Sequence, residues 1–295
     1  MHARTARSPL YAAGVAAVAA AALAGCASAG SGTAAAKPTA AASATPLAAV
    51  KLAAKTTSGA SSFTGTISVQ ATAKNGASSD NNVTVKATMA ERVRPSIEAE
   101  VQIGTLSAGG SSMPGEMTEV ITPSDFYMKW AVLTQELHQS KPWLVLPVSA
   151  LSKSSGINFS ELFSSATNSS PLNESQMLAG ASSVRKVGTG TINGVPVTEY
   201  TGTLSLAKSM QYLTGSAKSA MEKEIAAGGL STASFSVWID GQQVMRKMTV
   251  TESGTEVTEV TTVTVASINQ PVNIAIPAAS QTSPMPAAAL SGLGS

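Results

Sequence analysis

The chain has 295 residues, with 19 Lys and Arg against 17 Asp and Glu, and 4% of its residues are aromatic. This near-neutral balance supplies no basic surface for neutralising phosphates, so it excludes nucleic acid as a class of partner. A single cysteine allows no disulfide within the chain and no thiolate-rich metal site. The fold must therefore depend on an ordinary hydrophobic core.

The first 25 residues have the layout of a secretory signal peptide. Arg4 and Arg7 form a short basic region, and an apolar stretch follows from Leu10 to Leu23. This stretch is shorter than the roughly 20 residues that a membrane-spanning helix needs, which disfavours a retained transmembrane helix. Removing residues 1–25 takes away two arginines and no acids, so the mature chain is formally neutral.

The segment Leu23-Ala24-Gly25-Cys26 resembles the lipobox of bacterial lipoproteins. In that family the cysteine thiol receives a lipid, the chain is cut before the cysteine, and the new N-terminus is acylated with a fatty acid such as palmitate. The resemblance implies that Cys26 is the first mature residue and anchors the protein to the outer face of the cytoplasmic membrane. Several acyl chains, at about 0.8 kcal/mol per buried methylene, would make this anchor firm. The alternative is a plain signal peptide that contains a cysteine.

Residues 26–46 are predicted to form a disordered tether, because a segment of Ala, Ser, Gly, Thr and Pro cannot bury a core. The spacing of apolar residues then predicts a short amphipathic helix over 47–57, with Gly59 as its stop.

Three successive runs, 63–72, 83–89 and 96–103, alternate apolar and polar residues with a period of two. This pattern predicts an antiparallel meander with one wet face and one apolar face. Two further strands are predicted over 116–122 and 125–130, and their pattern is less regular.

The strand pattern disappears between residues 131 and 181. An apolar segment over 144–151 and short helical pieces around 160–167 and 171–181 are predicted to form a helical insert that covers the sheet.

The second half returns to strands. Asn193-Gly194 suits a type I′ turn and predicts a tight hairpin. The remaining predicted elements are hairpin strands over 184–192 and 195–206, a helix from Leu206 to Ile225, a second hairpin over 234–239 and 244–252, strands over 256–266 and 272–276, and a flexible tail over 278–295.

These elements predict one α+β domain over residues 47–277. We expect a strongly curved antiparallel sheet of about ten or eleven strands, shaped as a half-barrel, with helices covering its concave apolar face.

Groups able to support catalysis are few. His138 is the histidine that remains after signal removal, and no G-x-S-x-G motif accompanies it, so it is interpreted as a surface residue at a helix end beside Glu136. Glu98 and Glu100 share the wet face of one strand, where a solvated pair is favoured over glycosidase chemistry. We therefore expect no enzymatic activity, no metal site and no cofactor.

The sequence is rich in methionine, which fills irregular gaps and tolerates more than one packing. One interpretation is an ordinary core, and the other is an apolar cavity between sheet and helices that accepts an acyl chain. The candidate cavity residues are Ile67, Val69, Val85, Met89, Val101, Met210 and Met221.

Three motifs carry a resemblance to a known family: residues 193–203 (NGVPVTEYTGT), residues 238–241 (WIDG) followed by Arg246-Lys247, and residues 269–274 (NQPVNI). With the lipobox, they resemble the LppX/LprA/LprF/LprG lipoproteins of actinobacteria, which are structurally related to the LolA and LolB carriers. The resemblance implies a half-open antiparallel sheet curved round helices, with an apolar cavity that holds lipids or acylated glycolipids. Ala207, where an acid is expected, and the Ser/Asn-rich stretch 156–171 depart from the family and leave the ligand open.

The leading hypothesis is thus a membrane-anchored protein that binds or carries a lipid or lipidated molecule outside the cytoplasmic membrane. The alternative is a non-enzymatic interaction or sensor module, with the same sheet closed and dry, that binds another protein of the cell envelope.

Overall fold

The computed structural model describes residues 45–74, 82–93, 98–108, 111–112, 114–147, 175–212, 222, 232–254 and 257–286. Its first strands are β1 (Ser62–Ala73), β2 (Val83–Arg92), β3 (Glu98–Ala108), β4 (Ser111–Ser112), β5 (Met117–Ile121), β6 (Asp125–Trp130) and β7 (Trp143–Pro147). The later strands are β8 (Ala181–Ile192), β9 (Val195–Ser205), β10 (Thr232–Asp240), β11 (Met245–Ser253), β12 (Val257–Ile268) and β13 (Thr282–Pro284). The helices are α2 (Pro46–Ser58), α3 (Ala131–Glu136) and α7 (Leu206–Ser209), with 3-10 turns η2 (Ser175–Gly180), η3 (Met210–Tyr212) and η4 (Ala279–Gln281).

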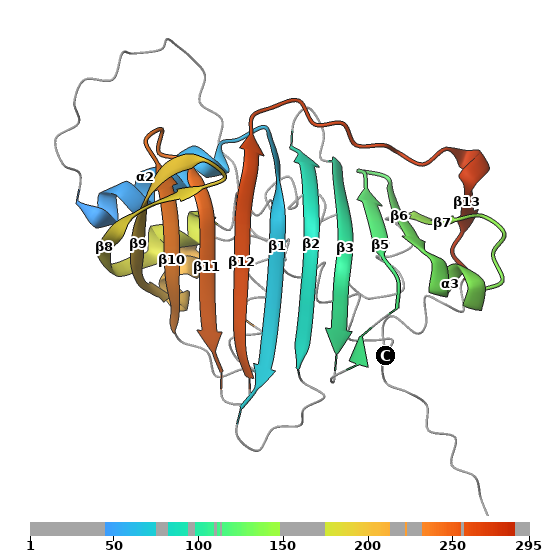
Figure 1. Cartoon of the computed structure of the whole chain (residues 1–295), viewed down its shortest axis with the longest axis horizontal. Helices are drawn as coiled ribbons and strands as arrows, with labels where there is room; N and C mark the ends of the chain where they lie inside the picture. Colours follow the sequence, from blue (N-terminus) through green and yellow to red (C-terminus); the bar gives the residue numbers. More distant parts are fainter. Residues whose placement is uncertain are drawn as a thin grey trace, which may run out of the picture.

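All described strands belong to one curved, open sheet (Figure 1). Twelve of them follow the order β13-β7-β6-β5-β3-β2-β1-β12-β11-β10-β9-β8, and β4 pairs with β3 off this path. Neighbouring strands run antiparallel except at one edge, where β13 is parallel to β7. The predicted fold class is therefore confirmed, although the described part already holds 13 strands rather than ten or eleven.

The centre of the sheet joins the two ends of the domain. Strand β1 pairs on one side with β2 and on the other with β12, so that Ile67 lies opposite both Ala87 and Val263. Along β1, Ile67 and Val69 are buried while Thr66 and Gln70 are exposed. The predicted three-stranded meander is thus found as β1, β2 and β3, with the predicted alternation of wet and buried side chains.

Helix α2 forms where the sequence predicts it. Thr45 caps its first turn by accepting a hydrogen bond from Ala48 N at 3.3 Å, Pro46 occupies the first helical position, and Gly59 follows the last turn. The helix packs on η2 and on strands β8, β10 and β11. In the part of the chain that the structure describes, no helix combines the length and apolar character needed to cross a bilayer.

Strand β7 corrects the prediction of a helical insert between residues 131 and 181. Residues 144–147 pair with β6, and Leu144 and Leu146 are buried while Val145 between them is less so. An apolar run of five residues satisfies a strand as well as a helix, and pairing with the free edge of β6 decides between them. Of the two predicted helical pieces, 160–167 lies outside the described residues, and the second is seen as η2.

The C-terminal region differs from the prediction in two places. Residues 272–276 form no strand, which agrees with the prolines at 271 and 277 that withhold backbone donors at both ends. The chain instead reaches β13, and Met285 packs with Leu144 and Leu146 of β7. The predicted flexible tail therefore begins too early, because residues 279–286 belong to the folded domain.

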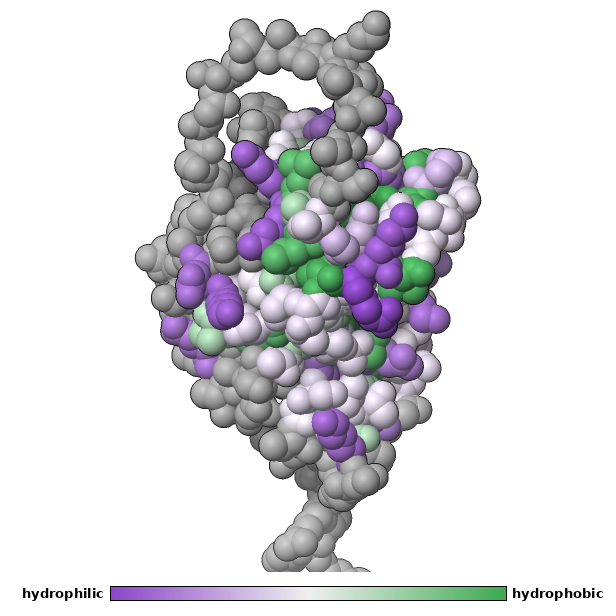
Figure 2. Space-filling view, turned by 90° about the vertical axis from the view of Figure 1, so that its left-hand side faces the viewer, coloured by the Kyte–Doolittle hydropathy of each residue, from purple (hydrophilic) through white to green (hydrophobic). Residues whose placement is uncertain are grey.

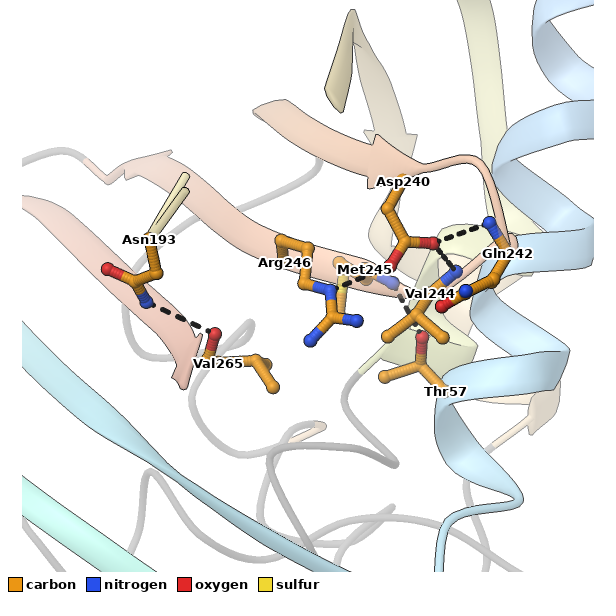
Figure 3. A network of polar contacts seen from close by, with 8 residues as sticks. All are labelled: Thr57, Asn193, Asp240, Gln242, Val244, Met245, Arg246 and Val265. Atoms are coloured by element: carbon orange, nitrogen blue, oxygen red, sulfur yellow. Dashed lines mark hydrogen bonds and ion pairs between the residues drawn. The ribbon is translucent and has the colours of Figure 1, made fainter. Parts of the chain in front are cut away.

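The β8–β9 hairpin has the predicted turn. Asn193 and Gly194 both have positive φ, at 49° and 79°, as a type I′ turn requires. The hairpin tip folds across the sheet, because the Asn193 side-chain amide donates to the carbonyl of Val265 on β12 at 3.5 Å (Figure 3). Strands β10 and β11 lie between these two residues in the sheet order.

Candidate functional site

The inner face of the sheet, defined as the face that carries α2, has a broad apolar surface over β12, β1, β2, β3, β5 and β6. Directly paired residues form a row across these six strands: Val263, Ile67, Ala87, Ile103, Met117 and Trp130. Each side chain of this row is buried. Alternation along the strands places these six residues on one side, so local sequence pattern is the main origin of the surface.

The predicted cavity residues fall into three groups. Ile67, Val69, Val85, Met89 and Val101 belong to one cluster on this surface, and each is at most 8% exposed. Met210 lies in η3 after α7, is half-buried and is not a member of that cluster. Met221 lies outside the described residues.

The described helices cover the other half of the inner face. Helix α2, η2 and α7 enclose a second apolar cluster with β9, β10 and β11, in which Val50, Leu178 and Phe235 are almost fully buried. Over β12 to β6, the described residues place only α3 at the far edge, where Val132 and Leu133 touch the first cluster. The two halves of the inner face are thus different environments.

A carboxyl group interrupts the apolar surface. Glu119 on β5 lies directly opposite Val101 on β3 and Met128 on β6, and it is 5% exposed. Burial in this apolar setting raises the pKa of Glu119 from 4.5 to about 7. Glu119 is not among the residues predicted for the site, although its alternation with Met117 and Ile121 was a usable signal that it faces inward.

Glu91 is a second carboxylate on the inner face. It lies opposite Phe63 and Ala99, nearer the end of β2, and is 4% exposed. The following residue, Arg92, forms an ion pair with Glu98 on β3.

The other candidates for chemistry lie apart from one another. Glu98 is held by Arg92, while Glu100 accepts a hydrogen bond from Gln102 Nε2 at 2.8 Å on the outer face, where the alternation predicts it. His138 is exposed beyond the end of α3 and has a positive φ of 52°. Among the described residues, no group of three His, Cys, Asp or Glu side chains is placed to hold a metal ion.

Two hollows lined by described residues lie at the β8–β9 hairpin. One, of about 370 Å³, is lined by Arg185 and by Ser and Thr side chains of β9, β10 and β11. The other, of about 450 Å³, lies nearer the hairpin tip and includes Tyr200 and Asp240. Figure 2 views the molecule from this edge, where hydrophobic residues gather in small groups between polar ones. Neither hollow reaches the first apolar cluster, since the two share no lining residue with it.

No protein-family model matches the sequence, and no curated protein matches it. Among solved structures, the chain is similar to lipoprotein LppX of Mycobacterium tuberculosis, with 18% identity over 78% of this chain and 98% of that one and a TM-score of 0.45. It is similar to LprF of Mycobacterium bovis, with 12% identity over 79% and 97% and a TM-score of 0.45. A LolA superfamily protein of Nitrosomonas europaea matches with 8% identity over 80% and 96% and a TM-score of 0.26. These are the family and the superfamily that the sequence motifs resemble.

Proposed function

We propose that this chain is a lipoprotein, anchored through Cys26 on the outer face of the cytoplasmic membrane, that binds or carries a lipid or an acylated glycolipid. The observation that carries the proposal is the apolar row across six strands of the inner face, from Val263 to Trp130. The described helices α2, α7 and η2 lie on the other half of that face. An acyl chain laid along the row would meet apolar side chains throughout its length.

The energetics favour such a ligand. A long acyl chain loses several hundred Å² of apolar surface on binding, which at about 25 cal/mol per Å² gives a gross driving force on the order of 10 kcal/mol. Met89, Met117 and Met128 lie on the same surface, and the flexible thioether side chains adapt to chains of different shape. Binding therefore needs no charged site, and no single residue dominates it.

The anchor is supported by the sequence around Cys26. The thiol is the only one in the chain, and it follows directly on the apolar stretch that ends at Leu23. Replacing Cys26 by Ser is expected to move the protein from the membrane fraction to the soluble fraction, as measured by fractionation and by the intact mass of the mature chain. A Cys26→Ser protein that stays in the membrane fraction contradicts the anchor.

The ligand proposal is tested on the full chain carrying Cys26→Ser, purified without detergent, extracted with organic solvent and analysed by mass spectrometry. The protein without substitutions on the inner face is expected to release bound lipid on extraction. Val101→Phe, which adds bulk to the apolar surface beside Glu119, should lower the lipid yield, whereas Gln102→Phe on the outer face of the same strand should not. Thermal unfolding of both variants shows whether each is folded.

The alternative is an interaction module that binds another envelope protein through a closed and dry sheet. It is favoured by the tight burial of the first cluster, whose members are each at most 8% exposed. The same experiment separates the two: a folded protein that releases no lipid, and takes up none when lipid vesicles are added, contradicts the carrier and leaves the interaction module.

A further inference from the structure

Glu119 is an acid in the middle of an apolar surface. It occupies the row formed by Val265, Gly65, Met89, Val101, Glu119 and Met128, which runs parallel to the wholly apolar row described above. The residue is 5% exposed, and burial alone accounts for the raised pKa of its carboxyl group, to which the described residues add no hydrogen bond or ion pair. Two of its row neighbours, Met89 and Val101, are candidate ligand-binding residues.

The two described side chains that lie directly opposite Glu119 cannot form a hydrogen bond with its carboxyl group. Val101 faces it from β3 and Met128 from β6, and neither carries a hydrogen-bonding group. The Trp130 indole N–H, on the same surface, donates to the carbonyl of Pro114 at 3.1 Å. Among the described residues, the two side chains paired with Glu119 across the strands therefore offer its carboxyl group no hydrogen bond.

The charged and titratable groups on the elements packed against this surface do not neutralise it either. The charged residue of β2 that faces inward is Glu91, which is itself an acid. On and after α3, Glu136 and His138 are exposed. In the described part of the chain, no cation faces Glu119 from these elements.

A buried polar group without a partner is costly, and an apolar side chain of similar size would serve the core better. The presence of Glu119 on the proposed ligand face points to a ligand group that forms a hydrogen bond with its carboxyl group. The raised pKa, about 7, means that the protonated carboxyl group is well populated at neutral pH and has an O–H to donate. Its natural partner is an acceptor that carries no charge.

We propose that Glu119 is the specificity-determining residue of the inner face, where its carboxyl O–H donates a hydrogen bond to an ester carbonyl of an acylated lipid. The inference rests on the proposed function and adds to it the chemical class that the site selects. The acyl chain lies on the apolar row, and the ester that joins it to the rest of the lipid lies beside Glu119.

The test compares two probes that differ by the ester, methyl oleate and 1-octadecene, on the full chain with Cys26→Ser after bound lipid has been extracted. At pH 6, the wild-type inner face should bind methyl oleate more tightly than 1-octadecene. Glu119→Leu should lower this preference roughly five- to tenfold, the worth of one hydrogen bond, while Glu119→Gln, which keeps a neutral donor, should retain it. Glu100→Gln, on the outer face of β3, is the matched control and should change nothing.

A pH profile separates recognition from a structural role. Raising the pH from 6 to 8 should lower the affinity of the wild type for methyl oleate about tenfold, because the donating proton is lost, and Glu119→Gln should abolish this dependence. If Glu119→Leu keeps the wild-type preference, or if Glu119→Gln keeps the pH dependence, the inference is wrong and the proposed function stands. If the wild type binds neither probe, both are wrong. Should Glu119→Leu fail to fold, the Glu119→Gln profile alone decides.

Discussion

Arg246 Nε lies 2.7 Å from Asp240 Oδ2, and the two side chains are 13% and 2% exposed (Figure 3). The other carboxylate oxygen of Asp240 accepts hydrogen bonds from the backbone N–H groups of Gln242 and Val244, each at 2.9 Å. One carboxylate thus fixes the β10–β11 turn and the first residues of β11 together.

Asp240→Ala should lower the free energy of unfolding by about 3 to 5 kcal/mol, because it leaves a nearly buried guanidinium and two turn amides without their acceptor. Urea unfolding followed by circular dichroism measures the change. Gln242→Ala is the control, since only the backbone of this exposed residue takes part in the turn. Equal effects of the two substitutions would contradict the role given to Asp240.

Thr57 joins α2 to the sheet through a buried hydrogen bond, which its hydroxyl accepts from Met245 N at 2.9 Å. Thr57→Val keeps the shape of the side chain and leaves a buried N–H without a partner, so it should cost about 1 to 3 kcal/mol of stability. The neighbouring exposed Thr56→Val serves as the control in thermal unfolding. A stability loss no greater than that of the control would show that the bond is dispensable.

Gly65 lies where the sheet has no room for a side chain. A Cβ at this position would collide with the Thr264 carbonyl oxygen and lie 2.8 Å from the Phe63 ring. Gly65→Ala should therefore destabilise the domain by more than about 2 kcal/mol, since the obstacle includes backbone. Gly104→Ala, on β3 with open space around it, should be neutral or stabilising. Two alanine variants of equal melting temperature would refute this account of Gly65.

Glu119 makes stability depend on pH with a defined sign. The unfolded chain ionises this carboxyl group near pH 4.5, whereas the folded chain holds the proton to about pH 7. The folded state therefore binds more protons in this window, and its stability falls by about 3 kcal/mol as the pH rises from about 4.5 to about 7.

Glu119→Gln removes that loss. We expect the stability of the variant relative to the wild type to increase between pH 4 and pH 8, as measured by urea unfolding at both values. Glu100→Gln should show no such increase. A Glu119→Gln effect of the same size at pH 4 and pH 8 would mean that the carboxyl group ionises normally in the fold.

Much of the fold follows from local pattern. Alternation located β1, β2 and β3, and Asn193-Gly194 identified the hairpin turn, because these features depend on residues close together in the chain. Strands β7 and β13 escaped prediction because each is short. Strand β13 also depends on a partner more than a hundred residues away, as in the pairing of Leu144 with Ser283.

The candidate site was predictable in part. Alternation placed Ile67, Val69, Val85, Met89 and Val101 on one face, and the structure brings them into one cluster. Met210 was grouped with them through helical spacing, but it lies in η3, directly after α7, and is not a member of that cluster.

Glu119 was overlooked because a charged residue in a strand ordinarily faces water. Its burial depends on the register between β3, β5 and β6, which local sequence does not determine. The motif residues Trp238, Asp240 and Lys247 make contacts that stabilise the fold. Asp240 holds the turn, and the Lys247 ammonium lies 4.7 Å from the centre of the Trp238 ring.

The pairing of β1 with β12 has a consequence for how the molecule comes into being. Residues 62–73 find their partner in residues 257–268, so the middle of the sheet is assembled from opposite ends of the polypeptide. A chain that emerges from N- to C-terminus cannot pair β1 with β12 until residues 257–268 have also emerged. Closing so long a loop is slow. Until then the apolar strands β1, β2 and β3 lack β12 as a neighbour. The protein therefore most needs protection from aggregation in the interval between the emergence of β1 and its pairing with β12.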